Sequence, residues 1–412
     1  MQRVITGATI LVGEDFEEIS DGFLTIENDR IVEIGSGRQA EDLTGWDASR
    51  CVIAPAFLNA HTHVSDSFMK ELAFGVSHWE AVMPPDGIRH RAFQQTPREV
   101  VKQGMRNTFE QMIECGITAF ADFREGGTDG VQLLREAAAG LPIRALALGR
   151  FRGFPPLPIA QVERNEGHLT QAMEQEILDT LEVADGFSCV TANDLSDPAL
   201  EDLARVVRQT SRLLTLHVAE SPEYRDISVR RTGKGDVERV LEHLRPDFVV
   251  HLTDATAREI DLLAAARMPA VCCPRIQGVM GNGFPRFDLM LERGMTVALG
   301  TDNVFLSSPD MLRELDYSSR VVRGLRRDPS FPSARQMLQM ITINPARILK
   351  LDRELGSIEV GKRADLVIFD AESRNLRPLA DPVASIVNRA ESRDIKAVFN
   401  GGALVSGALN LI

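Results

Sequence analysis

Two histidines, His61 and His63, stand one residue apart at the end of a run of small and apolar residues, 51–58. Such a run is typical of a buried strand. In an extended chain, residues i and i+2 point to the same side, so the two imidazoles can reach one metal ion. A His-x-His pair alone also occurs as two ordinary histidines, so its interpretation depends on whether the chain supplies further ligands.

Further candidate ligands stand at the ends of other apolar runs. His217 and His251 each lie within the end of such a run, and Asp302 and Glu220 each follow one closely. Singly, each has an ordinary explanation: a hydrogen-bonded core histidine, a helix N-cap for Asp302, a solvated turn residue for Glu220. Together, imidazoles and carboxylates at several strand ends favour a site for zinc, iron or manganese.

The elements that must position these residues are strands alternating with helices, from residue 51 to about 345. Eight strand-like runs are each followed by a helical pattern; the runs are 51–58, 117–123, 143–148, 187–191, 213–218, 247–251, 270–273 and 296–299. A regular βα alternation implies a parallel sheet, and eight units imply a closed (β/α)8 TIM barrel of the α/β class. Chemistry in such barrels lies where the strands end, which is where the candidate ligands fall.

Two segments are predicted as loops, and the first residues of the chain as strands. Residues 1–50 show short alternating apolar runs separated by turn residues, and they are too few to bury a core alone, so we expect them to pair with a distant segment. Residues 64–97 are predicted as a long loop, and the glycines within 278–283 as a flexible one. The glycine pattern lacks the strand–helix context of a phosphate-binding motif, so we do not expect nucleotide binding there.

Composition excludes several classes of protein. A formal net charge of −13 argues against a general nucleic-acid or anionic-membrane surface. Five scattered cysteines are too few for a disulfide framework, and the adjacent Cys272 and Cys273 do not form a Cys-x-x-Cys zinc site. We see neither a signal-peptide pattern nor a long apolar stretch. We therefore expect a cytoplasmic protein with a small-molecule partner, with no nucleic-acid or membrane partner, and with homo-oligomerisation left open.

These motifs together resemble the amidohydrolase superfamily, and most closely its aminohydrolase branch of deaminases and chlorohydrolases. The motifs that carry the resemblance are Pro55-Ala56-Phe57-Leu58-Asn59-Ala60-His61-Thr62-His63, His217-Val218-Ala219-Glu220, His251, Leu299-Gly300-Thr301-Asp302-Asn303, and the stretch 356–368. The resemblance covers nearly the whole chain. It implies that residues 1–50 and 355–412 form one small β-sandwich beside a barrel made of residues 51–354.

The resemblance also implies roles for individual residues. His61, His63 and His217 would bind a divalent metal, with Asp302 as the fourth ligand and as a proton acceptor. Glu220 would be the proton shuttle. The catalytic role implied for His251 is to polarise the reacting group. Zinc is the expected ion, and iron or manganese would also suit these ligands.

Metal number and substrate depend on the end of the fourth strand. Two-metal members of the superfamily carry a bridging lysine there, and this chain has none in 187–194, which favours one metal; Asp194 is a conceivable bridge. Many members of the branch carry a substrate-contacting histidine at the same place, where this chain has Asn193 and Asp194. This departure weakens the transfer of any named substrate.

The chemistry of such a site is the activation of water. A divalent metal lowers the pKa of bound water from 15.7 to about 7, and attack on an electron-poor ring carbon with assisted proton transfer would release ammonia. The sequence therefore predicts a metal-dependent aminohydrolase that deaminates a purine-, pyrimidine- or pterin-like amine. The alternatives are hydrolysis of a cyclic amide, amidine or ring chloride and, in another class, a non-catalytic binding protein on the same fold.

Four residues outside the ligand set are candidate substrate contacts. Trp79 could stack on a flat ring or pack within its own loop, and His90 could face the site or solvent. Arg150 follows the third strand and could bind a carboxylate, a phosphate or a ribose. Arg275 follows the seventh strand and is the strongest of these candidates.

Overall fold

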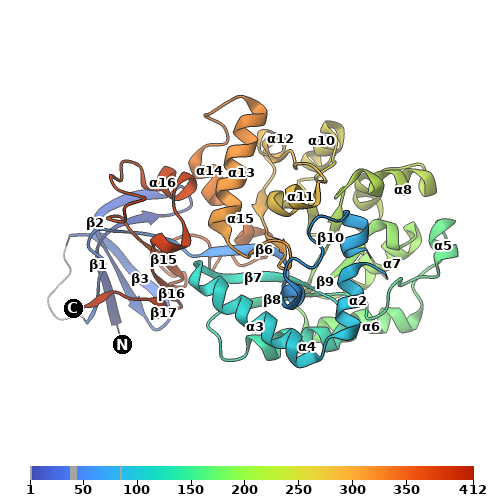
Figure 1. Cartoon of the computed structure of the whole chain (residues 1–412), viewed down its shortest axis with the longest axis horizontal. Helices are drawn as coiled ribbons and strands as arrows, with labels where there is room; N and C mark the ends of the chain where they lie inside the picture. Colours follow the sequence, from blue (N-terminus) through green and yellow to red (C-terminus); the bar gives the residue numbers. More distant parts are fainter. Residues whose placement is uncertain (1, 38–43, 84–85) are drawn as a thin grey trace.

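The computed structural model describes residues 2–37, 44–83 and 86–412. A parallel barrel surrounded by helices lies beside a second sheet, which contains both the first and the last strand of the chain (Figure 1). Within the described ranges, no helix has the length and apolar character needed to cross a membrane.

The barrel is built from parallel strands that follow one another in sequence order. They are β6 (Phe57–His63), β7 (Ile117–Arg124), β8 (Arg144–Gly149), β9 (Gly186–Thr191), β10 (Leu213–Val218), β11 (Phe248–His251), β12 (Ala270–Cys272), β13 (Val297–Leu299) and β14 (Asp302–Asn303). β13 pairs with β12, whereas β14, which follows on the same stretch of chain, pairs with β6 through Asp302 opposite Thr62. β13 and β14 together form the eighth barrel strand, which pairs with the seventh strand on one side and the first on the other and so closes the barrel. The predicted (β/α)8 architecture is confirmed.

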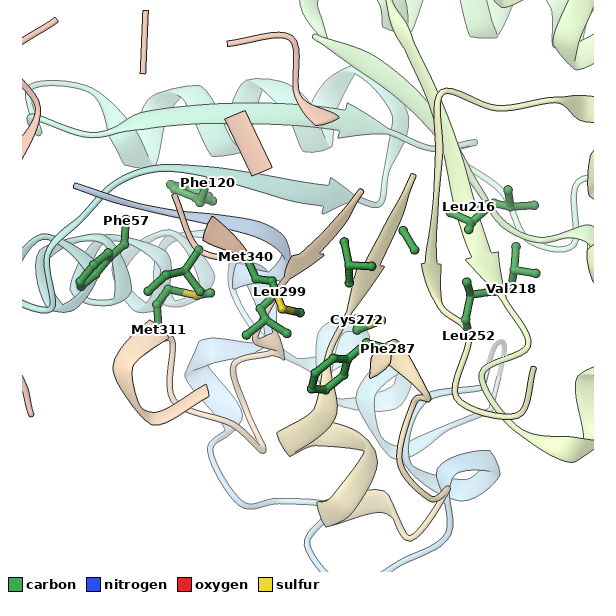
Figure 2. Packing of buried hydrophobic residues seen from close by; sticks show 14 of the residues in the cluster. Phe57, Phe120, Leu216, Val218, Leu252, Cys272, Phe287, Leu299, Met311 and Met340 are labelled. Atoms are coloured by element: carbon green, nitrogen blue, oxygen red, sulfur yellow. The ribbon is translucent and has the colours of Figure 1, made fainter. Parts of the chain in front are cut away.

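The strands form because apolar residues alternate between two buried surfaces. On β10, Leu216 and Val218 belong to the cluster that packs against the outer helices, together with Phe287 and Met311 (Figure 2). His217 lies between them and faces the barrel interior, where its ring packs beside those of other histidines. Burying each large apolar side chain in this layer contributes about 1.5–3 kcal/mol to stability. The same alternation that anchors the strand therefore aims His217 inward.

Helices surround the barrel and cover its C-terminal end. They are α1 (His78–Val82), α2 (Ile88–Gln95), α3 (Arg98–Glu114), α4 (Gly127–Ala138), α5 (Ile159–Glu163), α6 (Gln171–Val183), α7 (Asp197–Val207), α8 (Pro222–Thr232), α9 (Asp236–Arg239), α10 (Ala257–Ala265), α11 (Pro274–Met280), α12 (Phe287–Glu292), α13 (Met311–Arg326), α14 (Ala334–Gln339), α15 (Ile343–Ile348) and α16 (Pro382–Asn388). Short helical turns cover Val64–Met69, Ala192–Asp194, Val240–Leu244 and Ser392–Asp394.

Two predicted loops prove to contain helices. The segment 64–97 includes the turn Val64–Met69, α1 and α2, and the glycine-containing segment after the seventh strand begins with α11. The expectation of a flexible loop at 278–283 was wrong for its first residues, because Gly278 lies inside α11 with no room for a side chain: a Cβ there would lie 2.5 Å from Tyr317 Oη. The glycine therefore serves helix packing.

The second sheet joins both ends of the chain. Its strand order is β17 (Ala403–Gly407), β16 (Ile395–Asn400), β15 (Leu366–Asp370), β5 (Cys51–Pro55), β1 (Gln2–Val12), β2 (Glu17–Glu27) and β3 (Arg30–Ser36). In addition, β4 (Gly45–Asp47) pairs with β1, and β18 (Asn410–Leu411) pairs with β4. The sheet folds over one apolar core, in which Trp46 of β4 packs edge-on against Phe399 of β16 with ring centroids 4.9 Å apart. The expected sandwich is thus a single hydrogen-bonded sheet folded over its core.

The apolar run 51–58 is divided between the two sheets. β5 pairs with β1 and β15, and only the residues from Phe57 onward enter the barrel. The expectation of one barrel strand through 51–58 was therefore wrong. Both halves are fully buried, so hydropathy does not mark the change of sheet. We propose Ala56, whose N–H donates to the Asp365 carbonyl at 3.0 Å, as the boundary between the two units.

Candidate active site

Four side chains from distant parts of the chain converge at the C-terminal end of the barrel. His61 and His63 come from β6, His217 from β10 and Asp302 from β14. The Nε2 atoms of His61 and His63 lie 3.2 and 3.4 Å from Asp302 Oδ1. The ring centroid of His217 lies 5.1 Å from that of His61. All four side chains are buried, so barrel closure brings the predicted ligands together out of solvent.

The backbone holds two of these histidines in one tautomer. The Nδ1–H of His63 donates to the Phe123 carbonyl at 3.2 Å, and that of His217 donates to the Val190 carbonyl at 2.7 Å. A neutral ring with its proton on Nδ1 presents a lone pair on Nε2. Hydrogen bonds of this kind commonly orient metal-binding histidines. Both rings are therefore prepared to ligate through Nε2.

Burial also keeps the ligand histidines uncharged. It lowers the pKa of His63 to about 3, and it lowers the pKa values of His61 and His217 far below the ordinary range. The neutral imidazole is the form that binds a metal. The ligand atoms of His61, His63 and His217 all lie within 4.8 Å of one another. Three neutral imidazoles beside one carboxylate fit a divalent transition metal such as zinc.

A fourth histidine faces the same centre in a different way. Strand alternation would aim His251 outward like Val249, but left-handed backbone at His251 (φ 81°) and Leu252 (φ 55°) turns the chain. The His251 ring stacks on that of His217 with centroids 5.0 Å apart. Its Nδ1 accepts a hydrogen bond from Gln277 Nε2 at 3.1 Å, which places the proton of the neutral ring on Nε2. His251 is therefore a hydrogen-bond donor towards the centre.

Glu220 lies beside this donor, just beyond the end of β10. Its Oε2 is 3.5 Å from His251 Nε2, and its Oε1 is 3.6 Å from His78 Nδ1. Ala219, which precedes it, has a φ of 47°, and Asp302 has a φ of 60°. Positive φ is uncommon for residues with a side chain and is often found at functional sites. These strained turns direct the carboxylates of Glu220 and Asp302 towards the same centre.

Three neighbouring cavities share lining residues at this centre. A small one of about 40 Å³ is lined by His63, His217 and Asp302 together with His78 and Glu220. It shares Met83 and Tyr224 with a larger, mostly apolar cavity of about 280 Å³. It shares Arg150 with a third cavity of about 150 Å³. A small molecule could thus reach the ligand cluster and extend sideways.

The structure brings three of the four predicted substrate contacts to these cavities. Trp79, 49% exposed, lines the larger cavity, and His90 lines the third while its Nε2–H donates to the Val82 carbonyl at 3.0 Å. Arg150 lines the central cavity, with Nη2 3.4 Å from His217 Nε2. Its Nε is buried and has no partner among the described residues.

Arg275 lies elsewhere. Its guanidinium donates to the Ser308 carbonyl at 3.1 Å and lies 3.6 Å from Glu314 Oε2, beside a separate surface cavity. Because α11 begins at Pro274, one helical turn carries Gln277 rather than Arg275 towards the centre. The structure therefore does not support Arg275 as a substrate contact.

Several residues at the site were not predicted. His78 stands on α1, within the segment 64–97 that was expected to be a loop, and Gln277 stands on α11, between the predicted strand 270–273 and the predicted loop 278–283, so no strand-end rule pointed to either. Glu125 follows β7 and would have been found by applying that rule to the second strand; it accepts from Arg89 at 2.6 Å and from Arg124 at 2.7 Å. Asp194, considered as a metal bridge, instead accepts the Thr191 N–H at 2.8 Å in a local cap.

Known proteins resemble this chain in sequence and in fold. The model of the amidohydrolase family matches residues 52–405. The chain is 34% identical over 402 residues to a putative aminohydrolase of Methanothermobacter thermautotrophicus, with 98% of each chain covered. It is 27% identical to a 5-methylthioadenosine/S-adenosylhomocysteine deaminase of Moorella thermoacetica, over 94% of this chain and 90% of that one. A zinc-bound adenosine deaminase from Xanthomonas campestris superposes with a TM-score of 0.83 at 20% identity, over 97% of this chain and 92% of that one.

Proposed function

The chain belongs to the amidohydrolase family, and we propose that it is a metal-dependent aminohydrolase that releases ammonia from a heterocyclic amine. Family membership makes it a hydrolase of carbon–nitrogen bonds other than peptide bonds. One observation carries the proposal of deamination: three neutral histidines and Asp302 meet within reach of the Glu220 carboxylate. Relatives named as deaminases of adenosine derivatives support a nitrogen-containing ring as the substrate.

The metal would be held by His61, His63, His217 and Asp302. Once bound there, a divalent metal supplies a Lewis acid that activates water at neutral pH. We propose a single zinc ion, because the end of β9 carries no lysine and Asp194 is engaged by the Thr191 N–H. The tautomers of His63 and His217 support ligation through Nε2.

The protein's own groups would move the protons. The reaction converts a ring amine and water into a ring carbonyl and ammonia, so one proton of the water ends on a ring nitrogen and the other on the leaving nitrogen. Glu220 would accept one proton and pass it to the ring nitrogen, and Asp302 would accept the other, which is then transferred to the leaving nitrogen. His251 would donate its Nε2–H to the oxygen that adds to the ring. Positioned acid–base groups of this kind contribute about 10²–10⁴-fold each.

Substrate selection would depend on the cavities beside the centre. We propose that Arg150 contacts an anionic or hydrogen-bond-accepting group, because its buried Nε has no partner among the described residues. The other guanidinium nitrogens contact Glu125 and His217, so such a partner would satisfy the remaining buried N–H. Trp79 would pack on the part of the substrate that occupies the larger, apolar cavity. His90, held by the Val82 carbonyl, would border the cavity that contains Arg150.

Metal analysis combined with an ammonia-release screen tests this function. We expect about one zinc per chain and ammonia from at least one member of a panel of purines, pyrimidines and pterins. Glu220→Gln should keep the metal and lower kcat by about 10²–10⁴-fold. The matched control is Glu223→Gln, an exposed carboxylate one turn away in α8. Full activity of Glu220→Gln would contradict the proposal, and turnover only of cyclic amides or ring chlorides would assign a different leaving group.

A further inference from the structure

A chain of side-chain amides leads from α11 to His251. Gln277 is fully buried, and its Nε2 donates to His251 Nδ1 at 3.1 Å and to Glu220 Oε1 at 3.4 Å. Its Oε1 accepts from Asn282 Nδ2 at 2.8 Å. Both ends of the Gln277 amide are therefore engaged, and neither lies in contact with the four ligand residues.

Glu220 and Asn282 together decide which way this amide faces. The backbone N–H of Asn282 donates to the Gln277 carbonyl at 3.0 Å, just after Gly281 ends α11 with a φ of 72°. This turn carries the Asn282 side chain back over that of Gln277. Because the Glu220 carboxylate can only accept, the nitrogen of Gln277 must face Glu220 and His251, and its oxygen faces the Asn282 amide nitrogen, which donates to it.

The tautomer of His251 decides whether this residue can bind the metal, because the position of the ring alone would permit ligation. The ligand atoms of His61, His251 and Asp302 lie within 4.8 Å of one another, as do those of His61, His63 and His217. Carbonyl groups hold His63 and His217 with lone pairs on Nε2, whereas an amide N–H holds His251 with a proton there. A protonated Nε2 cannot bind a metal, but it can donate to a substrate oxygen.

We propose that Gln277, oriented by Glu220 and Asn282, is a positioning residue that holds His251 as the Nε2–H tautomer. His251 is thereby kept as a hydrogen-bond donor and excluded from the metal-ligand set. Apart from Glu220 Oε2 at 3.5 Å, nothing among the described residues approaches this Nε2 closely enough to accept from it, so the N–H is available to substrate. The catalytic consequence rests on the proposed aminohydrolase function; the tautomer itself does not.

Histidine ¹⁵N NMR of the full chain measures the tautomer directly. The chain has eight histidines, and the His251 signals are assigned by their loss in His251→Gln. We expect His251 to carry its proton on Nε2 in both the metal-free and the zinc-loaded protein. A proton on Nδ1 would overturn the proposal.

Asn282→Asp tests the relay without altering Gln277 or His251. An ionised carboxylate only accepts, so it should draw the Gln277 NH₂ towards itself, turn the amide oxygen to His251 and move the His251 proton to Nδ1. Asn282→Ala is the matched control: it introduces no competing acceptor, and the contact of Gln277 with Glu220 should preserve the Nε2–H tautomer. If Asn282→Asp does not fold, Gln277→Glu provides the same change, since its carboxylate accepts from Nδ1–H. An unchanged tautomer in the folded variant would overturn the proposal.

Kinetics provide the second readout. Loss of one donor to a developing oxyanion typically lowers kcat by about 10²–10³-fold, so Asn282→Asp should lower kcat by that factor with a much smaller change in KM. Asn282→Ala should stay within about tenfold of the wild type. Wild-type kcat in Asn282→Asp with a displaced proton would overturn the positioning role. Absence of ammonia release from the wild-type protein would contradict the proposed function alone, because the tautomer is measured without substrate.

Discussion

His217 Nδ1 lies 2.7 Å from the carbonyl oxygen of Val190 on the adjacent strand, β9. The same ring receives an N–H of Arg150 at Nε2, 3.4 Å away. Both contacts require the proton on Nδ1 and the lone pair on Nε2. The barrel backbone itself therefore sets the tautomer that a metal ligand needs, and His251 differs because a side-chain amide takes the place of the carbonyl.

The first prediction separates the ligand histidine from the donor histidine. His217→Gln should lower zinc affinity well beyond tenfold, because it removes a ligand, whereas His251→Gln should retain about one zinc per chain. Competition with a chelator followed by elemental analysis measures both. Both variants should lose activity, so metal content is the discriminating result. Equal metal loss in the two variants would place His251 among the ligands.

The second prediction concerns a glycine packed against a metal ligand. A Cβ at Gly300 would lie 2.7 Å from His61 Cβ and 2.9 Å from the His61 backbone nitrogen, so Gly300→Ala must displace β6. We expect zinc affinity to fall about 10–100-fold and stability to fall by about 1–3 kcal/mol. The control is Gly324→Ala on α13, where no atom lies within 4 Å. That variant should bind zinc normally and gain about 0.5–1 kcal/mol from helix propensity. Normal zinc binding by Gly300→Ala would show that His61 does not depend on this contact.

The third prediction contrasts two arginines that follow barrel strands. Arg150→Met should reduce kcat/KM about 10–100-fold on the preferred substrate, with little loss of Tm, because its ion-pair partner Glu125 keeps the shorter contacts with Arg89 and Arg124. Arg275→Met should lower kcat/KM by less than about tenfold, which is the smallest loss expected for Arg150→Met. It should nevertheless lower Tm, because it leaves the buried Glu314 carboxyl without its cation. Steady-state kinetics and thermal unfolding check both. The reverse pattern would return Arg275 to the substrate site.

The fourth prediction is a pH dependence of stability. Burial, only partly offset by Arg275, raises the pKa of the Glu314 carboxyl to about 7. The unfolded chain would have the ordinary value of about 4.3, so between these pH values the folded protein binds the proton more tightly and stability falls as pH rises. Glu314→Gln removes this loss. Between pH 5 and pH 8 the wild type should therefore lose about 1–3 kcal/mol of stability relative to Glu314→Gln. This loss should appear as a Tm difference that grows in favour of the variant as the pH rises. Parallel Tm curves across this range would refute the assignment.

Local sequence patterns predicted the barrel and the candidate metal ligands. Eight apolar runs, each followed by a helical pattern, predicted a closed barrel, and closure through β14 and β6 confirms it. His61, His63, His217 and Asp302 could be found because strand ends of a parallel barrel meet at one face, whatever their distance in sequence. Alternation along β10 was enough to aim His217 inward between Leu216 and Val218.

Other features depend on contacts that no local pattern contains. The run 51–58 is divided at Ala56 because β5 pairs with β15 in one sheet and β6 pairs with β7 in the other. Both halves are equally buried, so their hydropathy does not reveal the division. The glycines of 278–283 suggested a loop, although Gly278 is a packing position against Tyr317. Arg275 was predicted as a substrate contact because a charge at a strand end is conspicuous in sequence, whereas no local pattern indicates that α11 directs Gln277 to the site.

The sequence alone thus determined which residues could bind a metal, and the tertiary structure decided what each histidine can do. A histidine's chemistry depends on which of its nitrogens carries the proton, and a hydrogen-bond partner selects that nitrogen. Those partners are Phe123 for His63, Val190 for His217 and Gln277 for His251, and they lie between 26 and 60 residues away along the chain. Only the folded barrel brings a carbonyl to two of the rings and an amide to the third.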